Sequence, residues 1–154
     1  MLNVNKKAVQ DAVHDWLSQV QTLDELINAK LAERDQVLTM ATSTGTNMDG
    51  LPHGNGKTDK VGNAAVKLAQ LAQEIDEAVG RYVDLKRSIV TELEKLPDVE
   101  YAVIHRRYIR YMTWEDIAKD MGYSTMQIWR YKVKAFERLY ETCDRKLYCT
   151  CGTI

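Results

Sequence analysis

Three groups of residues in this 154-residue chain have side chains that could do chemistry, and the first is a set of possible metal ligands. Cys143, Cys149 and Cys151 form a C-x5-C-x-C pattern near the end of the chain. A structural zinc site normally uses four ligands and a C-x2-C pair, so we expect no metal and a reduced, partly exposed tail over residues 143–154. The histidines lack ligand spacing as well, because they are His14, His53 and His105.

The second group is a glycine-rich stretch, GLPHGNGKT, which ends in Gly-Lys-Thr as a phosphate-binding P-loop does. A P-loop has four residues between its first glycine and the Gly-Lys pair and follows a buried strand. Here five residues separate Gly50 from Gly56, and the preceding sequence is helical. We therefore predict no nucleotide hydrolysis. Serines and carboxylates elsewhere have no adjoining base motif, so we expect no catalytic residue, no enzyme and no cofactor.

The third group is basic and polar, and the chemistry that it favours is recognition of nucleic acid. Residues 125–138 contain four basic residues and one acidic residue, a local charge of +3 in a chain whose formal net charge is −1. This charge favours a phosphate backbone as the partner, and a solvated helix face is the plainer alternative. The candidate DNA-binding residues in this segment are Thr125, Met126, Gln127, Trp129, Arg130 and Lys134.

Two capped helices are predicted to position these residues. Thr113 can cap a first helix, with Asp116 three residues later, and Gly122 can end that helix. Ser124 then opens a second helix with Gln127 at the capping-box position. Two capped helices joined by a Gly-containing turn are typical of a helix-turn-helix, whose second helix can enter the major groove of DNA.

Apolar spacing predicts which side of the second helix is buried. Residues recur there at intervals of three and four, and they are Ile128, Tyr131, Ala135 and Leu139. We expect this stripe to pack on Ile117, Ala118 and Met121, which leaves Met126 and Trp129 on the outer side. An outward Trp129 has two interpretations: it touches a thymine methyl or a sugar, or it packs against another part of the protein.

A third helix is predicted just before this pair, in the segment LPDVEYAVIHRRYIRYM. Pro97 suits an early helical position, and the core candidates are Val99, Ala102, Val103 and Ile109. Basic residues interleaved with Tyr108 and Tyr111 should give this helix a basic face that contacts phosphates, and they are Arg106, Arg107 and Arg110. Residues 97–142 are thus predicted to form a three-helix DNA-binding domain.

The first 96 residues have a different organisation and charge. They contain 11 basic and 14 acidic residues, against 10 and 8 in residues 97–154. An a/d heptad seam runs through Val61, Ala65, Leu68, Ala72, Ile75, Val79, Tyr82, Lys86, Ile89, Leu93 and Leu96. Apolar residues upstream of the glycine-rich residues 42–58 recur at a similar spacing, and the glycines can reverse the chain. We therefore predict an all-α chain that begins with a long, coiled-coil-like antiparallel hairpin over residues 1–96. Such a hairpin favours oligomerisation or a spacing role.

Two segments carry resemblances to known families. Residues 113–139 resemble, without a gap, the C-terminal promoter-reading region of bacterial sigma factors, called region 4. The resemblance implies promoter contact by Thr125, Met126, Trp129 and Arg130, although Met126 and Trp129 stand where polar or basic residues are typical. Residues 50–68 contain a Pro-His-Gly and an Asp-Lys-Val-Gly-Asn sequence. Together with the sigma-like helix-turn-helix, this segment resembles RinA-type and ArpU-type transcriptional regulators of phages and prophages. This resemblance implies control of phage late genes.

These features lead to one expected function and two alternatives. We expect a sequence-specific transcriptional regulator that binds double-stranded DNA, acts alongside RNA polymerase and forms a homo-oligomer through the hairpin. The alternatives are a small terminase-like packaging protein and a non-DNA adaptor that contacts RNA polymerase. An odd cysteine count without a signal peptide suggests the cytoplasm of a bacterial host, and no apolar run is long enough to cross a membrane.

Overall fold

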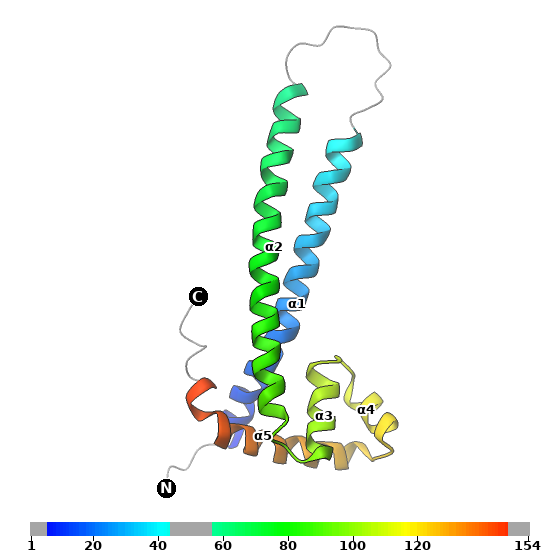
Figure 1. Ribbon diagram of the computed structural model, residues 1–154. Helices are drawn as coiled ribbons and strands as arrows, with labels where there is room; N and C mark the ends of the chain where they lie inside the picture. The colour runs from blue at the N-terminus through cyan, green and yellow to red at the C-terminus, as the bar shows by residue number, and fades with distance from the viewer. Residues whose placement is uncertain (1–5, 44–56, 148–154) are drawn as a thin grey trace. The chain divides into compact units, whose positions relative to one another are not determined.

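The chain has an all-α fold, as the sequence predicts. The computed structural model describes residues 6–43 and 57–147, and in that part it contains five helices and no strand. The helices are α1 (Lys6–Thr42), α2 (Lys57–Leu93), α3 (Asp98–Tyr108), α4 (Trp114–Met121) and α5 (Thr125–Leu147) (Figure 1). Position 53, with its predicted loop histidine, and the cysteines at 149 and 151 lie outside the described residues.

The helices group into two compact units. Unit 1 consists of the described residues within 1–22 and 83–154, and unit 2 consists of those within 23–82. This division differs from the predicted boundary at Pro97. The first turns of α1 and the last turns of α2 belong to unit 1 because they pack with α3 and α5. For example, His14 Nδ1 on α1 lies 2.8 Å from the hydroxyl oxygen of Tyr108 on α3.

Unit 1 holds nearly all of the buried apolar side chains. Its core combines residues from all five helices, because each helix contributes one apolar stripe. The fully buried large side chains of unit 1 are Val13, Leu17, Val20, Ile89, Leu93, Val103, Ile104, Ile117, Ile128, Phe136 and Leu139. Tyr108, which lies between the arginines in the sequence, is 5% exposed and packs 6.2 Å from Phe136, measured between ring centroids. Tyr108 therefore belongs to the core of unit 1.

Unit 2 pairs α1 and α2 in opposite directions. Lys30 forms an ion pair with Glu74, and Lys67 Nζ lies 2.8 Å from Glu33 Oε1, so positions later in α1 meet positions earlier in α2. The hydrogen bond and charge of Lys67 lower the pKa of the Glu33 carboxyl. The buried apolar residues in the described part of unit 2 are few, namely Ile27, Leu71 and Ala78. Unit 2 therefore has a small core for its length. Its exposed ion pairs add little stability.

The seam of α2 is only partly the one predicted. Leu68, Ile75 and Tyr82 are half-buried as expected, and the next row toward α1 is the one that holds Leu71 and Ala78. In unit 2 the predicted row of Ala65, Ala72 and Val79 is exposed, as is Val61, whereas the later seam residues Ile89, Leu93 and Leu96 are buried as predicted. Both rows flank the same central residues on a helix, so spacing alone did not distinguish them.

Candidate nucleic-acid interface

The turn between α4 and α5 is built by the caps that the sequence predicts. Thr113 Oγ1 accepts a hydrogen bond from the backbone N–H of Asp116 at 3.2 Å and caps the start of α4. Gly122 ends α4 with φ 69°, in the left-handed region that glycine tolerates best. Ser124 Oγ then accepts from the N–H of Gln127 at 3.2 Å. These local bonds fix where α5 begins.

Packing beneath the turn fixes how α5 is rotated. Ile128 is 1% exposed and Ile117 on α4 is fully buried, while Ala135 and Leu139 continue the buried stripe along α5. Tyr131, the remaining member of the predicted stripe, is half-buried. The prediction omitted Phe136, which is fully buried because α3 packs against the same side of α5.

Five of the six candidates on α5 are exposed, and they are Thr125, Met126, Trp129, Arg130 and Lys134. Four of them lie in the first two turns of the helix, where a helix that enters the major groove presents its side chains to base edges. Gln127 is different, because it is half-buried and its side-chain amide lies 3.4 Å from the Tyr131 hydroxyl. Gln127 therefore supports the start of the helix, and its predicted contact with DNA has no support from its position.

The three arginines of the preceding segment have different surroundings. Arg106 Nε donates to the Asp120 carboxylate at 2.6 Å, which ties α3 to α4. Arg107 Nη1 donates to the backbone carbonyl of Met112 at 2.8 Å, next to Tyr111, whose φ of 56° turns the chain between the two helices. Arg110 is exposed beyond the end of α3. Of the three, Arg110 is best placed to reach a phosphate.

Two tryptophans and two cations form a cluster at the start of α4 and α5. The Trp114 and Trp129 rings meet edge to face with centroids 6.4 Å apart. Lys132 Nζ lies 4.1 Å from the Trp129 centroid and 5.5 Å from the Trp114 centroid, and Arg107 lies 5.4 Å from the latter. Burial, with a smaller contribution from Arg107, lowers the pKa of the Lys132 ammonium. Trp129 thus packs within unit 1 and also remains 49% exposed.

Sequence reasoning missed Trp114 and Lys132 as parts of this site. The i, i+3 spacing of Trp129 and Lys132 places the two on one side of a helix and was the available signal. Trp114 follows the Thr113 cap directly, and its contact with α5 depends on the angle between the helices. The packing of the core sets that angle, so the spacing of residues in the sequence does not predict it.

Residues 23–141 of the chain match a family described as protein of unknown function (DUF722). The chain belongs to this family. No curated protein and no solved structure matches it. The matched range includes the complete α3, α4 and the exposed candidates on α5, and it starts within α1. The family's shared sequence therefore covers the whole candidate interface.

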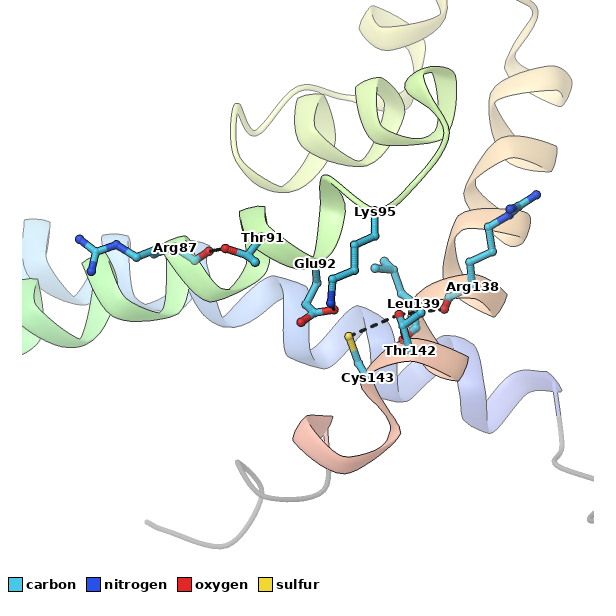
Figure 2. A network of polar contacts seen from close by, with 8 residues as sticks. All are labelled: Arg87, Thr91, Glu92, Lys95, Arg138, Leu139, Thr142 and Cys143. Atoms are coloured by element: carbon cyan, nitrogen blue, oxygen red, sulfur yellow. Dashed lines mark hydrogen bonds and ion pairs between the residues drawn. The ribbon is translucent and has the colours of Figure 1, made fainter.

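A second polar cluster lies where α2 meets the later part of α5 (Figure 2). Glu92 is 3% exposed and accepts a hydrogen bond from Lys95 Nζ at 2.7 Å, which raises the pKa of that ammonium. Cys143 is 1% exposed, and burial raises the pKa of its thiol. The predicted, partly exposed tail over residues 143–154 thus begins with a buried residue, because α5 continues to Leu147 and Cys143 extends its buried stripe.

Another buried carboxylate faces α5 from α3. Glu100 is 5% exposed, and its Oε2 lies 3.2 Å from Arg138 Nε as an ion pair that lacks the alignment of a hydrogen bond. Arg138 thus pairs with a buried carboxylate, although its own side chain remains 55% exposed.

No group of metal-binding side chains occurs among the residues described, and none of their helices has the length and apolarity to cross a membrane.

Proposed function

We propose that the chain is a double-stranded DNA-binding regulator of transcription in which α5 lies in the major groove. The observation that carries the proposal is the capped turn at Gly122, which leaves Thr125, Met126, Trp129 and Arg130 exposed on the first two turns of α5. Side chains at that position of a helix-turn-helix reach base edges, while neighbouring cations hold the phosphates. The resemblance to RinA-type and ArpU-type regulators favours phage or prophage late genes as the target.

Charge supports duplex DNA as the partner. Lys119, Arg110, Arg130 and Lys134 are exposed in the segment that contains α4 and α5. Glu115, Asp116 and Asp120 are exposed on α4 too, but the first two lie in its first turn and Asp120, near the Gly122 turn, is paired with Arg106. When such cations neutralise phosphates, DNA releases its condensed counterions into solution, so binding weakens as the salt concentration rises.

The test of this function is the affinity of the whole chain for labelled duplexes between 50 and 200 mM salt. If about three phosphates are neutralised, the affinity should fall roughly 40-fold over this range, with a log–log slope of about −2.7. Binding that does not change with salt, or no binding at 50 mM salt to any duplex from a random pool, would contradict the proposal.

The adaptor alternative has one observation in its favour. Met126 is 64% exposed and Trp129 is 49% exposed, and large apolar surface is common at protein interfaces. In that case RNA polymerase or another protein covers α5. The same titration of duplex DNA separates the two alternatives, because an adaptor would not bind a duplex alone.

Association through unit 2 is a second part of the proposal. The described part of unit 2 buries few apolar residues, while Val61, Val66 and Val79 on α2 are 58%, 59% and 39% exposed. A second copy of the chain would cover the Val61 and Val79 row, where Ala65 and Ala72 allow close helix approach. Sedimentation equilibrium of the whole chain should show a dimer or larger species that Val79→Glu weakens and the exposed control Gln70→Glu does not. A monomer at all concentrations would contradict this part.

A further inference from the structure

The exposed large apolar residues of unit 1 are concentrated at the start of α5. In the described part of this unit they are Val83, Tyr123, Met126 and Trp129, at 42%, 38%, 64% and 49% exposure. Three of the four lie within seven residues that begin just after Gly122. Apart from Val83, the other large apolar side chains in the described part of the unit are buried or half-buried. This concentration indicates that the start of α5 meets an apolar group on its partner.

Trp129 is held in place before any partner arrives. The Trp114 ring meets the Trp129 ring edge to face, and Lys132 Nζ lies 4.1 Å from the Trp129 centroid. A side chain that is fixed by two neighbours loses little conformational entropy on binding. Met126 lies three positions earlier on the same side of the helix and is flexible, so the pair offers one rigid and one adaptable apolar surface.

Charge around this apolar pair favours DNA over an apolar protein groove. Arg130 and Lys134 are exposed on the same side of α5, and Lys132 lies directly against Trp129. An apolar protein groove would have to remove water from these cations without compensation. The phosphates on both sides of a major groove would pair with them instead.

We propose, on the basis of the function proposed above, that Met126 and Trp129 read the C5-methyl groups of thymines. Among the groups by which the major groove distinguishes the base pairs, the thymine C5-methyl is the apolar one, and the others are hydrogen-bond donors or acceptors. Covering those polar atoms with a methionine or an indole leaves them unpaired, whereas covering a methyl removes apolar surface from water. The target of this chain therefore carries thymines where the first two turns of α5 contact it.

The test removes the methyl groups from the DNA and leaves the protein unchanged. Duplexes are first enriched from a random library with the whole chain, and each thymine of the enriched site is then replaced singly by deoxyuridine, which keeps the hydrogen-bonding atoms. We expect about a fourfold loss of affinity at one or more positions, the value for one methyl group removed from water. Met126→Ala or Trp129→Leu should abolish the loss at the position that each residue reads. The control Val83→Ala, exposed on α2, should leave every loss in place.

Each result decides the proposal. Equal affinity for thymine and deoxyuridine at every position, with salt-dependent and sequence-specific binding retained, would overturn methyl reading and leave the DNA-binding function intact. Losses that persist in both variants would overturn the assignment to Met126 and Trp129. No duplex binding at all would overturn both proposals.

Discussion

Arg106 Nε lies 2.6 Å from the Asp120 carboxylate and joins α3 to α4 beneath the Gly122 turn. An arginine that looks like a DNA contact in the sequence is thus already paired with a carboxylate of its own unit. Arg110, four residues later, is exposed. The two residues carry the same charge, but Arg106 should contribute to stability and Arg110 to DNA binding.

The first prediction compares these two arginines. Arg106→Ala should lower the free energy of unfolding by up to about 1 kcal/mol, since the pair is partly exposed, and should leave the salt dependence of DNA binding unchanged. Arg110→Ala should leave stability unchanged and reduce the salt slope by about 1, because one phosphate contact is lost. Chemical denaturation and duplex titrations measure the two effects. The reverse pattern would place Arg106 on the DNA.

A second prediction uses two glycines with opposite backbone requirements. A Cβ at Gly122 or at Gly80 would meet no atom within 4 Å, so space does not distinguish them. Gly122 has φ 69°, and Gly122→Ala should lower the free energy of unfolding by about 1 to 2 kcal/mol. Gly80 lies inside α2, and Gly80→Ala should raise it by about 0.5 to 1 kcal/mol. Equal shifts in both variants would argue against the left-handed turn.

A third prediction concerns stability at high pH. Burial raises the pKa of Tyr108 from 10.0 to about 12, with Arg107 opposing the shift. Because Tyr108 ionises more easily in the unfolded chain, its stabilising effect is complete below pH 10 and is lost as the pH rises toward 12. The free energy of unfolding should fall by about 2 to 3 kcal/mol from this residue, at about 1.4 kcal/mol for each pKa unit.

The check is denaturant unfolding between pH 8 and pH 12 in two tyrosine variants. Tyr108→Phe should remove this share of the alkaline loss, although it also removes the contact between Tyr108 and His14. Tyr123→Phe, at an exposed position, should keep the loss. Identical pH profiles for the wild type and Tyr108→Phe would show that Tyr108 is not buried in solution.

The parts of the fold that the sequence predicted are those that depend on neighbouring residues. Thr113, Gly122 and Ser124 make the predicted caps because a cap needs only a side chain or a backbone angle within one turn. The rotation of α5 also followed from spacing, as the burial of Ile128 and Leu139 confirms.

The parts that the sequence did not predict depend on distant contacts. The sequence did not predict the burial of Tyr108, because this burial depends on α5, which brings Phe136 against it. The heptad spacing places Ala72 and Val79 on the seam, yet both are exposed, because spacing does not distinguish two rows on α2 that would each suit a helix partner. For the candidate site, exposure of Trp129 followed from the period, whereas its contact with Trp114 required the angle between α4 and α5.

The most direct test of the central claim is the ratio of affinities for an enriched duplex and for a random one, measured at one fixed salt concentration. Arg130→Ala should lower the specific affinity by about 1 to 3 kcal/mol and reduce this ratio. The control Arg87→Ala removes the same charge from an exposed position on α2 and should change neither value. An unchanged ratio in Arg130→Ala would contradict the claim that the start of α5 reads the sequence of DNA.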